Sequence, residues 1–134
     1  FIVLFRAHYE VNKALEIKDN DFIKDMSNYK NLNELLMISD ILISDYSSIM
    51  IDYAILERPI YSYAYDYEKY CEKRGLYIDL GQELPNGYYK KEEEILEAIK
   101  TCDYVAQKEK TIKFRQKYVQ VLGEASKYID NIIN

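Results

Sequence analysis

A turn with the sequence Asp-Tyr-Ser-Ser, residues 45–48, lies between an apolar run and a segment with a helical pattern. Backbone N–H groups at the start of a helix lack partners within the helix, and with serine hydroxyls they can hold a phosphate. Ser47 and Ser48 are therefore candidate phosphate ligands, although Ser47 is equally suited to be an ordinary N-cap. The sequence contains neither a GxxxxGKS/T loop nor a GxGxxG turn, which excludes two common nucleotide-binding motifs.

A second candidate site follows the apolar run at 1–5, where Arg6 and His8 stand two residues apart. His8 is the only histidine of the sequence. A histidine can transfer a proton near neutral pH, and an arginine can bind phosphate oxygens in a fork geometry. This spacing favours a phosphate-ester site, with a purely structural histidine as the alternative.

Two further charged residues could contact a nucleotide. Arg74 precedes Gly75 and could reach a phosphate, or it could be an ordinary cation at a helix C-terminus. Asp52 lies one helical turn beyond Ser48. Its carboxylate could accept a hydrogen bond from a ribose hydroxyl, or it could simply favour the N-terminal half of a helix.

These residues need a scaffold, and the pattern of apolar and polar segments predicts an α/β fold with a parallel sheet covered on both faces. Ligands of such sheets bind beyond the carboxyl ends of the strands, where the candidate residues lie. Residues 81–89 are predicted to be a loop, and Asn31 with Glu34 to form a capping box. Strands are predicted at 1–5, 22–26, 40–44, 60–65 and 76–80. Helices are predicted at 31–39, 48–56 and 67–74, from Lys91 onward, and after Gly123.

The composition supports one globular domain and excludes several other classes. The chain has 134 residues, of which 49% are apolar and 31% charged. A net charge of −5 argues against nucleic acid as a partner. Two cysteines without a CxxC motif make a disulfide scaffold or a zinc site improbable and favour a reducing cytoplasm. Because the sequence opens inside a strand-like run, we expect a fragment of a longer protein.

Several short motifs follow one another in a set order within residues 1–100. They are Arg6-Ala7-His8-Tyr9, Asn33-Glu34-Leu35, the run from Ser39 to Ser48, Asp52-Tyr53-Ala54, Arg58-Pro59-Ile60, Tyr65-Asp66 with Glu68 and Tyr70, Arg74-Gly75-Leu76-Tyr77, and Asp79. This ordered series resembles the CDP-glycerol:poly(glycerophosphate) glycerophosphotransferases, the teichoic acid primases and polymerases.

The resemblance implies a GT-B glycosyltransferase fold, in which two Rossmann-like halves face a cleft. Residues 1–134 would form the C-terminal, donor-binding half, with 101–134 as its last helices, and an N-terminal half would be missing. Such an enzyme transfers glycerol phosphate, or ribitol phosphate, from a CDP-linked polyol donor to a hydroxyl of a lipid-linked polymer acceptor and releases CMP. No cofactor or metal is implied. The parent enzyme is expected in the cytoplasm, peripheral on the inner face of the membrane.

The resemblance also implies roles for individual residues. His8 would lie against the donor pyrophosphate and stabilise charge on the transferring phosphoryl group. The base would rest on the backbone near Lys24 to Ser27, which includes Met26. The remaining expected ligands are Arg6, Ser47, Ser48 and Arg74 for phosphate, and Met26 and Asp52 for the nucleoside.

Two alternatives remain open. The chain could be a GT-B donor domain for another nucleotide sugar in capsule or polysaccharide synthesis, and the base edge contacted near Met26 would then differ. It could also be a non-catalytic α/β nucleotide-binding module. On the principal interpretation, we expect the isolated chain to bind its donor weakly and to have little or no transferase activity.

Overall fold

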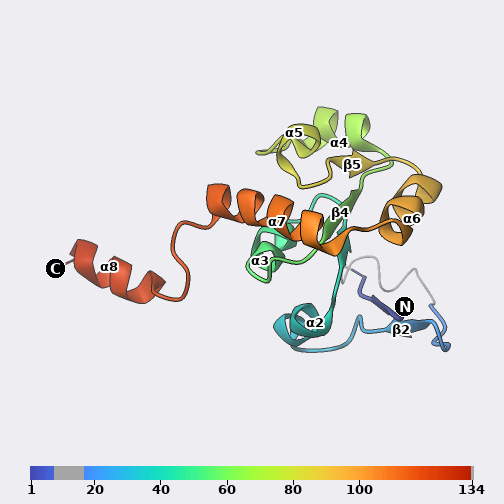
Figure 1. The fold of residues 1–134 in the computed structure, drawn as a ribbon, viewed down its shortest axis with the longest axis horizontal. Coiled ribbons are helices and arrows are strands. Elements are labelled where there is room, and N and C mark those ends of the chain that lie inside the picture. The colour runs from blue at the N-terminus through green and yellow to red at the C-terminus, as the bar shows by residue number, and fades with distance from the viewer. Residues whose placement is uncertain (8–16, 134) are drawn as a thin grey trace. The chain divides into compact units, whose positions relative to one another are not determined.

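The computed structural model describes residues 1–7 and 17–133, and its contacts divide the chain into two compact units. Unit 1 is Phe1–Ser39 and unit 2 is Asp40–Asn134. Each unit contains its own parallel sheet, so the strands that the sequence assigns to one sheet are divided between two (Figure 1). The expectation of one Rossmann-like domain over 1–134 remains a prediction.

The sheet of unit 1 consists of two parallel strands, β1 (Val3–Phe5) and β2 (Ile23–Asp25). Their pairing extends past the strand ends, because the N–H of Met26 donates to the carbonyl of Phe5 at 2.7 Å. The carboxyl ends of the two strands therefore lie side by side, and Arg6 and Met26 follow them directly. Both strands fall within segments predicted from the sequence.

The helix of unit 1, α2 (Leu32–Ile38), confirms the predicted helix at 31–39, but the predicted capping box is wrong in its bonding. The side chain of Asn31 makes no hydrogen bond to the helix backbone. Its amide instead donates to Glu34 Oε1 at 2.7 Å. The same carboxylate also accepts the hydroxyl of Tyr29, which holds it away from the N-cap N–H.

The sheet of unit 2 has three parallel strands in the order β3–β4–β5. They are β3 (Leu42–Ser44), β4 (Ile60–Tyr63) and β5 (Tyr88–Tyr89). The central strand lies in the core, since Ile60 and Tyr61 are each only 1% exposed. This burial explains why β4 has the sequence Ile-Tyr-Ser-Tyr, in which large apolar or aromatic residues flank the small, buried Ser62.

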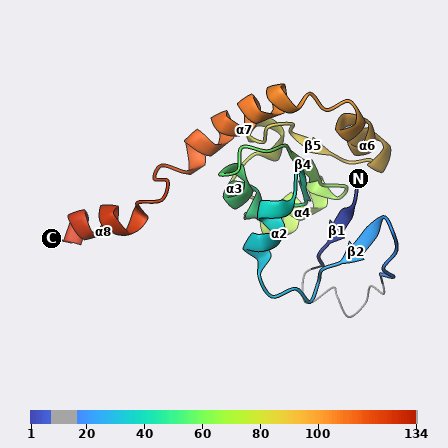
Figure 2. The same cartoon turned by 60° about the horizontal axis from the view of Figure 1, so that its bottom comes forward.

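Three helices cover this sheet: α3 (Ile49–Ala54), α6 (Glu92–Lys100) and α7 (Tyr104–Tyr118). Helix α3 packs against α7 and against β3 and β4, and α6 packs against β4 and β5 (Figure 2). Tyr53 of α3 and Phe114 of α7 are buried in the core of unit 2. The packing fixes α3, and with it the turn that precedes it.

Helix α4 (Tyr67–Arg74) confirms the predicted helix at 67–74. It ends at Gly75, whose φ of 68° is a left-handed conformation that glycine adopts without steric cost. Arg74 is therefore the last residue of the helix, and its side chain is exposed.

The strand predicted at 76–80 is wrong. The carboxylate of Asp79 accepts hydrogen bonds from the N–H groups of Gly81 (2.9 Å) and Gln82 (3.1 Å) and caps a short helix, α5 (Leu80–Glu83). An aspartate cap stabilises a helix start in competition with an extended backbone. The third strand of the sheet, β5, lies instead within the segment predicted to be a loop.

The helical pattern predicted from Lys91 onward is divided into α6 and α7. Asp103 separates them, because its carboxylate accepts two N–H groups in the first turn of α7 at 3.0 and 3.1 Å. The predicted last helix follows Gly123 as α8 (Ala125–Ile133). In the described part of the chain, none of the helices combines the length and the apolarity needed to span a lipid bilayer.

Candidate functional site

The turn between β3 and α3 presents two exposed serines, Ser47 and Ser48. The Oγ of Ser47 accepts a hydrogen bond from the N–H of Ile49 at 3.3 Å, as an ordinary cap would. The hydroxyl of Ser48 makes no hydrogen bond to any residue that the structure describes. Both side chains are accessible to a ligand, and Ser48 has its full hydrogen-bonding capacity available.

Contacts from two other elements hold this turn in place. The buried hydroxyl of Ser62 in β4 donates to the carbonyl of Asp45 at 3.0 Å. The hydroxyl of Tyr46 donates to Asp66 Oδ1 at 2.6 Å, and Asp66 is the N-cap residue of α4. The ring of Tyr46 stacks on Tyr70 with 3.7 Å between centroids. The positions of the serines are thus set by contacts with β4 and α4.

The phenol of Tyr46 holds its proton more strongly than an exposed tyrosine does. Burial of Tyr46, and next the carboxylate of Asp66, raise the pKa of the phenol well above its usual value near 10. The phenol is therefore protonated at neutral pH and remains a donor. A ligand at the turn meets a fixed backbone and no ionised tyrosine.

Asp52 and Arg74 are both exposed, and neither forms a hydrogen bond or ion pair through its side chain with a described residue. Asp52 lies in the first turn of α3, the helix that follows Ser47 and Ser48 directly. Arg74 lies at the end of α4. No hydrogen bond or ion pair joins Arg74 to the β3–α3 turn within the described ranges.

The candidate residues of unit 1 gather at the carboxyl ends of β1 and β2. Arg6 donates through Nη1 to the carbonyl of Tyr29 at 2.6 Å. The N–H of Ala7 donates to Ser27 Oγ at 3.1 Å, and the N–H of Ser27 donates to Asp25 Oδ1 at 2.9 Å. Hydrogen bonding from the side chain of Ser27, and next from its backbone N–H, lowers the pKa of the Asp25 carboxyl. One guanidinium nitrogen is occupied, and the other donors of Arg6 have no hydrogen-bond partner among the residues that the structure describes.

Met26 follows β2 directly and is half-buried, with its N–H engaged by Phe5. It therefore lies beside Arg6 at the sheet edge, as the sequence suggested. His8, to which the resemblance gives the catalytic role, lies outside the described residues. Its role, and the ligand roles of the other candidates, remain predictions.

Asn86 is a structural residue of unit 2 that sequence reasoning missed. Its Nδ2 donates to the carbonyl of Ile60 (2.9 Å) and to Gln107 Oε1 (2.7 Å), and its Oδ1 accepts from Lys110 (3.1 Å). One amide thus connects the loop before β5 to β4 and α7. The Asn86-Gly87 pair signals a turn, but nothing in the sequence signals these partners.

The model of the CDP-glycerol:poly(glycerophosphate) glycerophosphotransferase family matches residues 1–134. The chain belongs to this family, which confirms the resemblance carried by its motifs.

Individual relatives agree with the family. A teichoic acid poly(glycerol phosphate) polymerase of Staphylococcus epidermidis is 39% identical, over 100% of this chain and 19% of the relative. A teichoic acid glycerol-phosphate transferase of Staphylococcus aureus is 38% identical, over 96% of this chain and 34% of the relative. The chain thus spans between about a fifth and about a third of these relatives.

A solved structure supports the same assignment. The wall teichoic acid polymerase TagF, in a histidine-to-asparagine variant soaked with CDPG, matches 99% of this chain and 34% of its own with a TM-score of 0.82 and 38% identity. The predicted fold class, a Rossmann-like α/β unit of the GT-B type, is confirmed by this likeness.

Proposed function

We propose that this chain forms the donor-binding part of a glycerophosphotransferase of teichoic acid synthesis. The enzyme would take glycerol phosphate from CDP-glycerol, transfer it to a hydroxyl of a lipid-linked polymer and release CMP. The family match along all 134 residues carries the proposal. The soak of the related TagF with CDPG supports the choice of donor.

In the proposed reaction the hydroxyl oxygen of the acceptor attacks the glycerol-bearing phosphorus of the donor. A new phosphorus–oxygen bond forms, and the bond from that phosphorus to the oxygen bridging to CMP breaks. CMP leaves with the electron pair, and the acceptor loses its proton. Charge spreads over the phosphoryl oxygens during transfer, so fixed donors and cations supply most of the catalysis.

The residues divide between this chemistry and the binding of the donor. His8 is proposed to stabilise the transferring phosphoryl group. Asp52 is proposed to accept from the ribose, and the backbone at Met26 to receive the base. The proposed ligands of the pyrophosphate are Arg6, Ser47, Ser48 and Arg74.

The exposure of the candidate ligands in unit 2 supports this division. Ser48, Asp52 and Arg74 have side chains without partners among the described residues, so binding breaks no existing contact. The turn that carries Ser48 is already fixed by Tyr46, so little ordering is needed when a phosphate binds. The proposed reaction needs no metal or cofactor, because the cations named above neutralise the pyrophosphate.

The relatives are three to five times longer than this chain, which agrees with an acceptor surface supplied by another part of the protein. We therefore propose a cytoplasmic, peripheral membrane enzyme as the parent, in contact with a lipid-linked acceptor. On this proposal the isolated chain binds the donor with modest affinity and turns it over slowly or not at all.

Isothermal titration calorimetry of the 134-residue chain tests the proposal. CDP-glycerol and CMP should bind, and UDP-N-acetylglucosamine should bind more weakly or not at all. Ser48→Ala and Arg74→Ala should each weaken CDP-glycerol binding several-fold with an unchanged circular dichroism spectrum, because each removes a phosphate contact worth about 1 kcal/mol. Lys100→Ala, an exposed change at the end of α6, is the matched control. A preference for the uridine ligand would overturn the choice of donor.

A further inference from the structure

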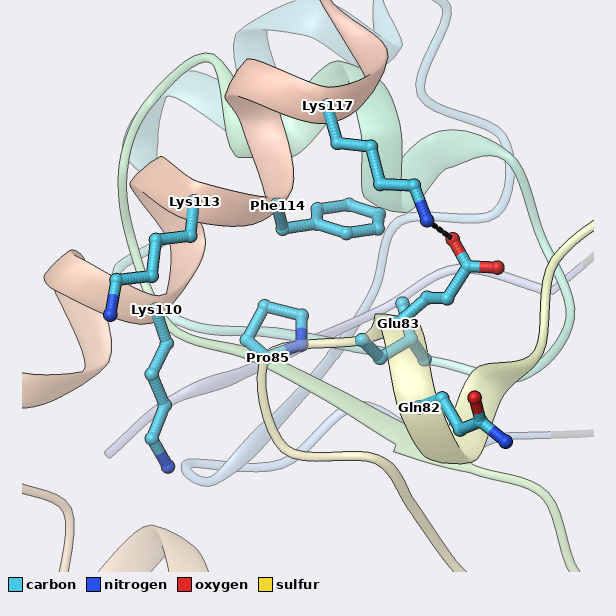
Figure 3. A pocket seen from close by; sticks show the side chains of 8 residues that line it. Gln82, Glu83, Pro85, Lys110, Lys113, Phe114 and Lys117 are labelled. Carbon is cyan, nitrogen blue, oxygen red and sulfur yellow. Dashed lines mark hydrogen bonds and ion pairs between the residues drawn. The ribbon is translucent and has the colours of Figure 1, made fainter.

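A pocket of about 280 Å³ opens in unit 2 between α7 and the segment formed by α5 and the residues after it (Figure 3). None of the residues assigned to the donor lines it. Its apolar floor includes Phe114, which is 4% exposed, and Pro85, which faces the Phe114 ring in Figure 3. The pocket is therefore a feature separate from the proposed donor site.

The rim of this pocket carries three lysines of one helix face. Lys110, Lys113 and Lys117 recur at spacings of three and four residues, so they follow one side of α7 over about 10 Å. Lys117 is paired with Glu83 at 2.5 Å. Lys110 donates to the neutral amide of Asn86 and forms no ion pair with a described residue. Lys113 has no hydrogen bond or ion pair with any residue that the structure describes.

The charges of the rim do not balance, although the whole chain is acidic. Glu83 is the only carboxylate of the pocket lining, so two positive charges remain in excess. The formal net charge of the chain is −5. A local reversal of charge beside a hollow attracts an anionic ligand. In Figure 3, Lys110 and Lys113 extend on one side of Pro85, while Lys117 reaches Glu83 on the other.

The shape of the pocket favours a flexible polyanion over a membrane surface as its ligand. Phe114 and Leu84 are 4% and 6% exposed, so the apolar groups are recessed and cannot insert into a bilayer. A chain in which phosphates alternate with short aliphatic units can place its carbons on the floor and its phosphates against the lysines. Lys110 and Lys113, the two lysines of the rim that no carboxylate neutralises, lie one helical turn apart and could each contact a phosphate of such a chain.

We propose that this pocket binds the phosphodiester backbone of a polyol-phosphate chain, with Lys110 and Lys113 as its principal phosphate contacts. The identity of the polymer rests on the proposed function, since the enzyme would extend a polymer of this kind. The pocket would retain the acceptor polymer at a place other than the donor site. Glu83 would oppose binding, because it neutralises Lys117 and repels phosphate.

Calorimetry with a synthetic tetramer of glycerol phosphate tests this site on the 134-residue chain. Lys110→Gln with Lys113→Gln should weaken tetramer binding about fivefold to tenfold, because two exposed ion contacts are lost. Glu83→Gln should strengthen binding several-fold, a gain that misfolding cannot produce. Lys100→Gln with Lys127→Gln removes the same charge outside the pocket lining and should leave the affinity unchanged.

Three results would overturn the proposal. The first is an absence of saturable tetramer binding, and the second is equal weakening by both double variants. The third is binding to phosphatidylglycerol vesicles through Lys110 and Lys113 without tetramer binding, which would make the surface a membrane contact. Inorganic phosphate should bind far more weakly than the tetramer, and equal affinity would argue for a single-ion site instead.

A parallel titration with CDP-glycerol separates this inference from the proposed function. Binding of CDP-glycerol without tetramer binding would remove only the pocket assignment. Tetramer binding that depends on Lys113, without any CDP-glycerol binding, would support the pocket and contradict the donor assignment. The pocket variants should leave CDP-glycerol affinity unchanged, because none of their residues belongs to the donor site.

Discussion

Each unit contains a hydrogen bond between a tyrosine and a carboxylate, and the surroundings of the two bonds differ. In unit 1, Tyr29 donates to Glu34, and the tyrosine is 40% exposed. In unit 2, Tyr46 donates to Asp66 and is half-buried against the stacked ring of Tyr70. Water competes with the first bond far more than with the second, so the second contributes more to holding its segment in place.

The serine hydrogen bonds at the two strand ends show the same contrast. Ser62 is fully buried and donates to the carbonyl of Asp45, at the start of the β3–α3 turn. Ser27 is half-buried and accepts from the N–H of Ala7, after β1. We infer that the turn of unit 2 is pre-formed for a phosphate, whereas the strand ends of unit 1 adjust when a ligand binds.

The largest effect is expected for His8, the residue to which the proposed function gives the catalytic role. In a full-length enzyme that carries this chain, His8→Ala should reduce turnover by about 100-fold to 10,000-fold, as the loss of a positioned catalytic group does. CDP-glycerol affinity should change much less. A steady-state assay of CMP release measures the first quantity and calorimetry the second. Near-normal turnover would make His8 a structural residue.

Next in size is the removal of the serine hydroxyls. Ser62→Ala should lower the free energy of unfolding by about 1–2 kcal/mol, because the hydrogen bond from its fully buried hydroxyl to the carbonyl of Asp45 is lost. Ser27→Ala, the matched change in unit 1, should cost clearly less, because water can replace the lost hydroxyl. Urea unfolding of both variants gives the two numbers. Equal losses would remove the distinction between the strand ends.

The same change, tyrosine to phenylalanine, removes either tyrosine–carboxylate hydrogen bond and so compares what the two bonds contribute. Tyr46→Phe should cost about 1.5 kcal/mol of stability, since it removes a half-buried hydrogen bond to a carboxylate. It should also weaken CDP-glycerol binding a few-fold, because the turn is no longer fixed. Tyr29→Phe should change neither quantity measurably. If both variants bind CDP-glycerol like the unchanged chain, the turn does not depend on Tyr46.

A smaller effect is expected at high pH, from the phenol of Tyr53 in the core of unit 2. Burial raises the pKa of Tyr53 to about 12, above the usual value near 10. Above about pH 10 the unfolded chain releases this proton and the folded chain keeps it. The contribution to stability, present in full below pH 10, is then lost as pH rises, by about 1 kcal/mol between about pH 10 and about pH 11.

Urea unfolding along a pH series measures this decline. Tyr53→Phe should make it shallower, whatever its effect on stability at neutral pH. Tyr77→Phe is the control, because Tyr77 is fully exposed. A decline of the same steepness in both variants would show that burial of Tyr53 does not govern it.

Local signals in the sequence predicted several elements correctly. The apolar run before residues 45–48 predicts β3 and its turn, and Gly75 predicts the end of α4. The prediction of a strand at 76–80 is wrong because it rests on the apolar residues alone. It leaves out the carboxylate of Asp79, which caps α5. The same kind of cap at Asp103 divides the predicted long helix.

The contacts that fix the candidate site could not be predicted in this way. Tyr46 and Asp66 are 20 residues apart in the sequence. Asn86 forms hydrogen bonds with Ile60 and Gln107, which are 26 and 21 residues away from it in the sequence. Such pairs depend on how the strands and helices pack, which no local pattern specifies. The sequence therefore indicates which residues could bind a phosphate, and the structure adds which residues hold them in place.

We propose that the pre-formed turn of unit 2 binds the donor pyrophosphate. An NMR titration of the isotope-labelled chain with CDP-glycerol tests it most directly, with the amides of 45–48 and 74–75 as reporters. We expect saturable shifts at these amides and none at 113–117 on the pocket rim. Shifts confined to other residues, or larger shifts with UDP-N-acetylglucosamine than with CDP-glycerol, would contradict it.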